Sequence, residues 1–117
     1  MKALQCVELA GPEKLIFTEV DDPKLSSGQV LLEIKAASVN FPDVLMIQGL
    51  YQNQPPMPFI PGAECSGVIT EIGEGVDSCN VGDHVFVMTG TGCFAEKLVV
   101  EAKSVSLIPK TMDFPVA

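Results

Sequence analysis

Hydrophobic and polar residues alternate in short segments along most of the chain. The alternation is clearest in residues 29–39, where the hydrophobic positions include Val30, Leu32, Ile34 and Ala36. A period of two residues is typical of a β-strand with one buried face. Hydrophobic segments predict further strands, separated by turns that contain glycine and proline, at residues 2–9, 15–20, 65–72, 84–88, 93–100 and 105–108.

One short helix is predicted after the strand at residues 29–39. Asn40 can cap it, and Asp43 places a negative charge near the positive end of the helix dipole. Gly49 ends the helix. The four prolines of residues 52–61 predict a stiff extended loop, and residues 113–117 predict the start of another element. These segments together predict a mainly β domain, an antiparallel barrel or a sandwich, with one short helix.

The length of 117 residues fits a single domain, residues 1–117, that can bury a hydrophobic core. The chain is 47% hydrophobic and 19% charged, which is apolar for a small domain. Either another polypeptide surface covers part of it, or the barrel is packed tightly. Fifteen acidic residues against seven basic ones give a net charge of −8. This charge disfavours binding to nucleic acid and to anionic membranes.

The four cysteines are too widely spaced to indicate a zinc site or a set of disulfides. Free, mostly buried thiols in a reducing compartment are expected. Glu8 interrupts the first hydrophobic segment too early for a signal peptide, and no segment approaches transmembrane length. We therefore expect a cytoplasmic protein.

Two patterns that could indicate chemistry have simpler interpretations. His84 is the single histidine and lies in a predicted strand, so a structural role is favoured over a catalytic relay. Residues 90–95 fit G-x-G-x-x-A, but strands rather than a helix are predicted after them. We interpret this stretch as a hairpin turn and not as a dinucleotide site.

Several motifs in order carry a family resemblance. Residues 38–51 (SVNFPDVLMIQGLY) resemble the active-site segment of zinc-independent quinone oxidoreductases. Residues 58–69 (PFIPGAECSGVI) resemble the P-G-x-E-x-x-G-x-V signature of the medium-chain dehydrogenase/reductase superfamily. Residues 81–85 and 92–96 match the next two landmarks of that family. The chain thus resembles the N-terminal GroES-like domain of the zinc-independent, zeta-crystallin-like branch.

The resemblance implies a GroES-like, partly open β-barrel with one or two short helices. In the family a Rossmann domain follows in the same polypeptide, and the nicotinamide lies in the cleft between the two domains. That domain is absent from residues 1–117, and it would bind most of the NADP(H). Alcohol dehydrogenases of the family have zinc ligands where this chain has Asn40 and Ala63, so no zinc is expected. The implied substrates are a quinone, an alkenal or an enoyl thioester, and homodimerisation is left open.

The same resemblance assigns candidate site residues. Tyr51 would hydrogen-bond or protonate the substrate carbonyl, and Asn40 would offer amide hydrogen bonds, so both are predicted catalytic residues. Asn40 and Asp43 are the predicted cofactor contacts, although both also suit a helix start, and Tyr51 also suits a barrel rim. Glu64 is expected to be paired or hydrogen-bonded. Core packing is the alternative for the hydrophobic members of the predicted substrate pocket, which consists of Phe41, Met46, Ile60 and Glu64.

Two functions remain open. The chain is either the substrate-side domain of a longer oxidoreductase, inactive by itself, or a naturally short GroES-like binding or oligomerisation module without enzymatic activity. A co-chaperonin-like barrel is disfavoured, because the proline loop at residues 52–61 is too stiff to dock a chaperonin.

Overall fold

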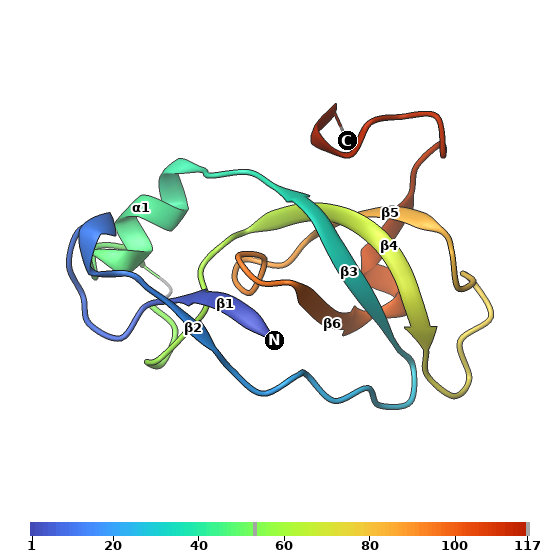
Figure 1. Ribbon diagram of the computed structural model, residues 1–117, viewed down its shortest axis with the longest axis horizontal. Helices are drawn as coiled ribbons and strands as arrows, with labels where there is room; N and C mark the ends of the chain where they lie inside the picture. The colour runs from blue at the N-terminus through green and yellow to red at the C-terminus, as the bar shows by residue number, and fades with distance from the viewer. Residues whose placement is uncertain (53, 117) are drawn as a thin grey trace.

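The strands form two antiparallel sheets (Figure 1). The computed structural model describes residues 1–52 and 54–116, so Asn53 of the predicted proline loop and Ala117 lie outside the described residues. The smaller sheet pairs β1 (Lys2–Gln5) with β2 (Ile16–Glu19). The larger sheet has the order β6-β3-β4-β5-β7, with β3 (Gln29–Ala37), β4 (Glu64–Ile72), β5 (His84–Met88), β6 (Lys97–Glu101) and β7 (Val105–Leu107).

The helical elements are short. One α-helix, α1 (Phe41–Ile47), follows β3, as predicted, and the 3-10 turns are η1 (Pro12–Lys14), η2 (Ala102–Ser104) and η3 (Phe114–Val116). The prediction of a mainly β, partly open fold with short helices is confirmed. None of the helices in the described part of the chain has the length and hydrophobicity needed to cross a membrane.

Two predicted strands are shorter than expected, because some of their residues form hydrogen bonds with neighbouring loops instead of with another strand. The strand predicted at residues 2–9 ends at Gln5, and Cys6 instead forms an isolated bridge with Phe59. The strand predicted at residues 93–100 begins only at Lys97. Its first residues bond to the loop before β4, since the N–H of Phe94 donates to the carbonyl of Pro61 at 3.0 Å.

The glycine-rich stretch at residues 90–95 is not a hairpin turn, and that prediction is wrong. β5 pairs with β4 and β7, whereas β6 pairs with β3, so the stretch connects strands that lie apart in the sheet. Gly90 and Gly92 have φ angles of 88° and 101°, a left-handed conformation that glycine adopts without steric cost. The local glycine pattern predicted a turn correctly, but it carried no information on which strands pair.

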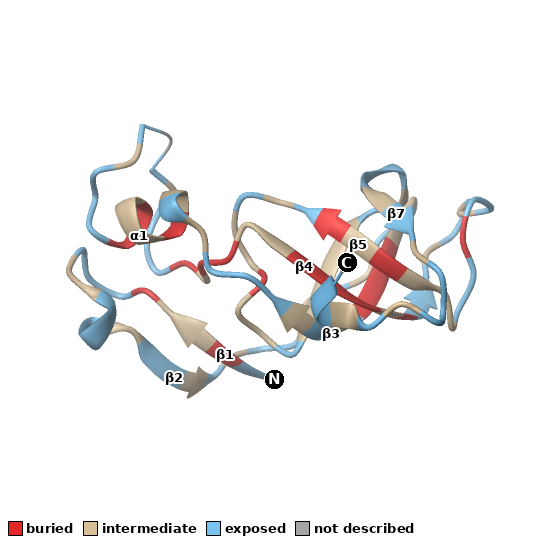
Figure 2. Ribbon diagram, turned by 90° about the horizontal axis from the view of Figure 1, so that it is seen from above, coloured by how far each residue is buried: buried red, intermediate tan, exposed pale blue. Residues whose placement is uncertain are grey.

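Buried hydrophobic residues form two separate clusters. Figure 2 shows buried residues in red both in the larger sheet and around α1. The first cluster lies on one face of the larger sheet and includes Leu32, Cys65, Ile69, Val85, Val87 and Cys93. The second cluster joins α1 to the loops around it and consists of Cys6, Met46, Ile47 and Phe59, with Leu15 and Tyr51 packed against it. All four cysteines are buried and free, as predicted.

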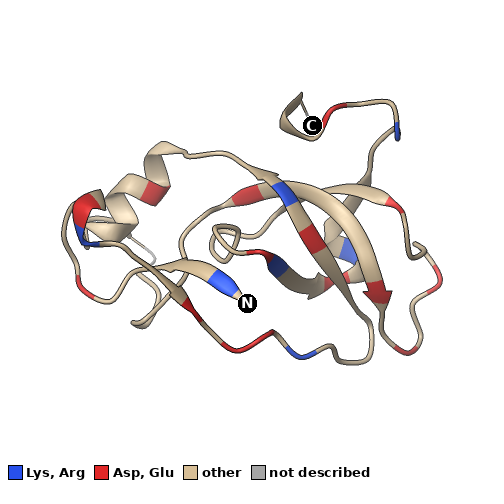
Figure 3. Ribbon diagram, viewed as in Figure 1, with Lys and Arg blue, Asp and Glu red and all other residues tan. Residues whose placement is uncertain are grey.

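Asp22 links the two sheets through charged groups. Its carboxylate accepts hydrogen bonds from the Lys97 ammonium on β6 at 2.7 Å and from the Met1 α-ammonium at 2.8 Å. These bonds, that from Lys97 above all, lower the pKa of Asp22 to about 2. Acidic residues lie on many elements of the chain (Figure 3). Asp22 differs from most of them because it forms ion pairs with two cationic groups, the Met1 α-ammonium and Lys97.

The Asp22 pairs should stabilise the fold only while Asp22 is ionised. The pKa of Asp22 is lower in the folded chain than the unfolded value of 3.8, so its contribution is present above pH 3.8 and is lost as the pH falls through about 2. We expect Asp22→Asn to be less stable than the wild type at pH 4 to 7, with a difference that disappears toward pH 2. Urea unfolding at a series of pH values measures this difference. Asp21→Asn, which removes a neighbouring exposed charge and keeps both pairs of Asp22, is the matched control.

Candidate functional site

Three polar side chains meet where β3 ends and β4 begins. β3 and β4 are paired at Ala37 and Cys65, and this register places the next residue, Ser38, across from Glu64. The Ser38 hydroxyl donates to Glu64 Oε1 at 2.5 Å. The Asn40 amide nitrogen Nδ2 donates to Ser38 Oγ at 3.2 Å. The prediction that Glu64 is hydrogen-bonded is therefore confirmed, and Asn40 is tied to Glu64 through Ser38.

Asp43 holds the beginning of α1 in place. Its Oδ2 accepts a hydrogen bond from the Asn40 backbone N–H at 2.9 Å, while its own N–H donates to the Asn40 carbonyl at 3.0 Å. The side chain is only 3% exposed, and Oδ1 is buried without a hydrogen-bond partner in the described part of the chain. Asp43 thus supports the helix start, as predicted, while its contact with a cofactor stays a prediction.

A pocket lies between the larger sheet and the C-terminal turn η3. Ala36, Ser66 and Phe86 are register partners on β3, β4 and β5, so their side chains share the face opposite the first hydrophobic cluster. The pocket has a volume of about 210 Å³, and its lining also includes Ser38, Glu64 and Phe114. Glu64 therefore faces a cavity, while its role in a substrate pocket stays a prediction.

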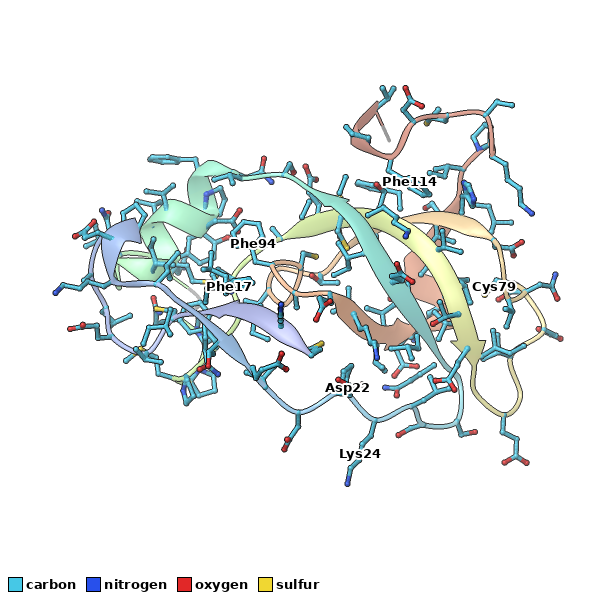
Figure 4. The ribbon with its side chains drawn as sticks, in the orientation of Figure 1. Phe17, Asp22, Lys24, Cys79, Phe94 and Phe114 are labelled. Atoms are coloured by element: carbon cyan, nitrogen blue, oxygen red, sulfur yellow. The ribbon has the colours of Figure 1, made fainter. Side chains whose placement is uncertain are left out.

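Two contacts fasten η3 over this pocket. The Ser66 hydroxyl donates to the Phe114 carbonyl at 2.7 Å. The Phe114 ring, labelled in Figure 4, lies 4.8 Å from the His84 ring, centroid to centroid, as measured between the two rings. His84 is thus a strand residue with an aromatic partner, in agreement with the structural role predicted for it.

The remaining predicted site residues lie in two places. Phe41 directly follows Asn40 and is 73% exposed. Met46 and Tyr51 instead pack in the second hydrophobic cluster, at the far end of α1 from Asn40. Ile60 is half-buried before β4, and its carbonyl accepts a hydrogen bond from the Gly92 N–H at 2.7 Å. The catalytic role of Tyr51 and the pocket roles of Phe41, Met46 and Ile60 stay predictions.

Two buried thiols lie beneath the site in the first cluster. The hydrogen bond between Cys65 and Cys93, together with burial, raises the pKa of Cys65, so that Cys65 is a neutral thiol. Among the described residues, no three His, Cys, Asp or Glu side chains are placed to hold a metal ion. With Asn40 and Ala63 as its neighbours, Glu64 provides a single carboxylate, which does not make a zinc site.

Sequence reasoning did not find Ser38, Ser66 or Phe114. A signal existed for Ser38, since it is a hydroxyl residue two positions before Asn40 at the end of an apolar strand. The place of Ser66 at the pocket depends on the β3–β4–β5 register, and that of Phe114 on a turn that folds back over the sheet. Neither can be read from local spacing.

Comparison with known proteins identifies the family. The family described as "Alcohol dehydrogenase GroES-like domain" matches residues 26–110. The chain therefore belongs to the alcohol dehydrogenase GroES-like domain family, and the predicted resemblance to the quinone oxidoreductases of the medium-chain dehydrogenase/reductase superfamily is confirmed.

Individual relatives agree with this assignment. The human synaptic vesicle membrane protein VAT-1 homolog is 36% identical over 116 residues, which is 95% of this chain and 30% of that protein. The rat quinone oxidoreductase is 34% identical over 116 residues, 97% of this chain and 35% of that protein. The Escherichia coli quinone oxidoreductase solved in complex with NADPH superposes with a TM-score of 0.90 at 25% identity, covering 97% of this chain and 35% of that one. This chain spans about a third of the length of each of these three proteins.

Proposed function

We propose that this chain is the substrate-side domain of a zinc-independent, NADPH-dependent oxidoreductase that reduces quinones or other activated C=C or C=O substrates. A Rossmann domain of the same polypeptide would complete the active site and bind most of the cofactor. The observation that supports this proposal most directly is the hydrogen-bond network of Asn40, Ser38 and Glu64 beside the pocket, in a chain whose relatives include quinone oxidoreductases. The reducing compartment indicated by four free cysteines supports a cytoplasmic location.

The residues at the start of α1 suit a planar ring that carries an amide. Asn40 offers an amide group, and the neighbouring Phe41 exposes a ring that can cover an apolar ring face. The nicotinamide, when bound, supplies the hydride. Hydride transfer to a conjugated carbonyl builds negative charge on oxygen, which an O–H or N–H donor stabilises. We assign the substrate-side donor role to Tyr51, whose hydroxyl is the single phenol in the chain.

Turnover should require both domains. We expect the 117-residue chain alone to oxidise no NADPH in the presence of a small quinone, because nothing in it resembles a pyrophosphate site. The chain joined to a Rossmann domain should turn over. The Rossmann domain used for this joined protein is the one encoded after residue 117 in the same gene, if there is one. Otherwise the Rossmann domain of the rat quinone oxidoreductase is used. The loss of absorbance at 340 nm measures both reactions.

The result separates the two functions considered. Turnover by the isolated chain would contradict the division of labour between the domains. A well-folded joined protein that oxidises no NADPH with quinones, alkenals or enoyl thioesters would contradict the oxidoreductase proposal. It would leave the binding or oligomerisation module, for which size-exclusion chromatography of the chain should then show a closed oligomer.

A further inference from the structure

We propose that Cys65 and Cys93 are a redox-sensitive pair that a hydroperoxide converts to a disulfide, and that this bond fastens residues 89–95 to the beginning of β4. The proposal goes beyond the function proposed above, because it needs neither the nicotinamide cofactor nor a second domain. It rests on the main-chain contacts between residues 89–95 and the start of β4, on the hydrogen bonds of the two thiols, and on their place next to the pocket.

Main-chain hydrogen bonds bring the two cysteines together, although they are 28 positions apart in the sequence. The Cys93 N–H donates to the Gly62 carbonyl at 3.2 Å, and the Thr89 N–H donates to the Ala63 carbonyl at 2.7 Å. The segment that carries Cys93 therefore lies alongside the residues that lead into β4, in which Cys65 is the second residue. Both cysteines belong to the first hydrophobic cluster and are 3% and 1% exposed.

The two thiols differ in their readiness to react. The Cys65 thiol donates a hydrogen bond to the Cys93 sulfur, and this bond lowers the pKa of Cys93 and raises that of Cys65. The Thr89 hydroxyl oxygen lies 3.4 Å from Cys93 Sγ and is a second hydrogen-bond partner of that sulfur. Because the thiolate is the nucleophile in thiol oxidation, Cys93 reacts first and Cys65 completes the disulfide.

The reaction balances with a hydroperoxide as the oxidant. The Cys93 thiolate attacks the peroxide, the O–O bond breaks, and the leaving alkoxide or hydroxide takes up a proton, which leaves a sulfenic acid on Cys93. The Cys65 sulfur then attacks the Cys93 sulfur, so that the S–S bond forms and the S–O bond breaks. The hydroxide that leaves combines with the proton of the Cys65 thiol to give water. The two thiols lose two electrons and two protons, and the peroxide is reduced to an alcohol and water, or to water alone.

A small peroxide can reach the pair although both thiols are buried. Cys65 is among the residues that line the pocket of about 210 Å³, whereas one water molecule occupies about 30 Å³. Residues 89–95 form the other cover of the pair, and a Cβ atom added at Gly90 would meet nothing within 4 Å, so this segment borders open space. The pair therefore lies between a cavity and a surface segment.

Cys79 is the internal comparison, because it is 3% exposed in the same cluster. The turn that follows it bonds to Ile69, four residues further along β4 than Cys65, which is roughly 13 Å at about 3.3 Å per residue. Figure 4 likewise shows the labelled Cys79 at the other end of the larger sheet from Phe94, the residue after Cys93. A disulfide spans at most about 7 Å between Cα atoms, so Cys79 should pair with neither cysteine.

The test exposes the 117-residue chain to hydrogen peroxide, without cofactor or quinone. In the monomer isolated afterwards, the number of thiols that react with a maleimide in denaturant should fall from four to two. Proteolysis after Asp and Glu then separates the four cysteines onto the peptides 1–8, 65–71, 78–83 and 84–96. The non-reduced digest should contain 65–71 joined to 84–96, and dithiothreitol should separate these two peptides.

The stability of the oxidised chain gives a second measurement. A disulfide restricts the unfolded chain, so oxidation should raise the thermal midpoint by on the order of 10 °C, and dithiothreitol should reverse the rise. Cys79→Ala is the matched control and should keep both the joined peptides and the rise. Cys65→Ala and Cys93→Ala should lose both.

Three results from the wild-type chain would overturn the proposal, and none of them depends on a variant that folds. They are a joined peptide that contains Cys6 or Cys79, a Cys93 oxidised to sulfinic acid without a cross-link, and four free thiols after a treatment that fully oxidises free cysteine. Since NADPH and quinone take no part in the experiment, its failure would leave the proposed function standing, and an inactive joined protein would leave the cysteine pair standing.

Discussion

Replacing Gly67 by alanine should destabilise the domain by about 3 kcal/mol, a large part of the total stability of a small protein. Gly67 lies in the middle of β4 and pairs with Ile34 on β3. A Cβ atom at this position would lie 2.1 Å from the backbone carbonyl oxygen of Glu33, and a main-chain atom cannot move aside as a side chain can. The clash would separate the two central strands of the larger sheet.

Gly75→Ala provides the comparison. Gly75 has a φ of +83°, and a Cβ built there meets nothing within 4 Å, so its replacement costs only the left-handed backbone, about 1 kcal/mol. Chemical unfolding followed by circular dichroism gives both values. Equal losses of stability in the two variants would show that β3 and β4 can separate at Gly67 without cost, contrary to the close approach in the structure.

Replacing Asn40 by alanine in the joined protein should lower kcat/KM for NADPH and quinone by about tenfold, the effect of one lost hydrogen bond of about 1.4 kcal/mol. The substitution also removes a helix cap, which costs the fold about 1 kcal/mol. Activity has therefore to be measured at a temperature where the variant is fully folded. Steady-state kinetics with varied NADPH separate the effect on KM from that on kcat.

Asn80→Ala is a matched control because Asn80 repeats the backbone arrangement of Asn40. The Asn80 N–H donates to Asp83 Oδ2 at 2.8 Å, and the Asp83 N–H donates to the Asn80 carbonyl at 3.1 Å. Asn80 is exposed in the turn before β5, away from the candidate site. Alanine keeps both of these backbone bonds, and we expect Asn80→Ala to leave turnover unchanged. A similar loss of activity in both variants would reduce the role of Asn40 to that of a cap.

Local patterns in the sequence predicted most of the elements. Alternation in residues 29–39 indicated β3, and the cap, proline and acidic residue before Val44 indicated α1, because these signals act within a few residues of one another. The hairpin predicted at residues 90–95 failed for the opposite reason. Strand pairing depends on contacts between residues that are far apart in the sequence. Glycine indicates a turn but does not indicate which strands pair on either side of it.

The candidate site was predictable only in part. Asn40 and Glu64 were found through family motifs, and the expectation that Glu64 is hydrogen-bonded followed from the cost of an unpaired buried charge. The bond from Ser38 to Glu64 joins residues 26 positions apart, so no local spacing could have indicated it. Met46 packs in the second cluster, and the pocket role that the family motif gave it stays a prediction.

The existence of two hydrophobic clusters has a consequence for local unfolding. α1 contributes to the second cluster and Cys65, next to Glu64, to the first, so the hydrogen bonds from Asn40 through Ser38 to Glu64 cross between the two clusters. We expect the two clusters to open as separate units. The separation of Asn40 and Glu64 is then set by how firmly the two units are held together. A ligand that contacts both sides gains affinity from a domain in which this opening is suppressed, and substitutions far from the site can weaken binding by loosening either unit.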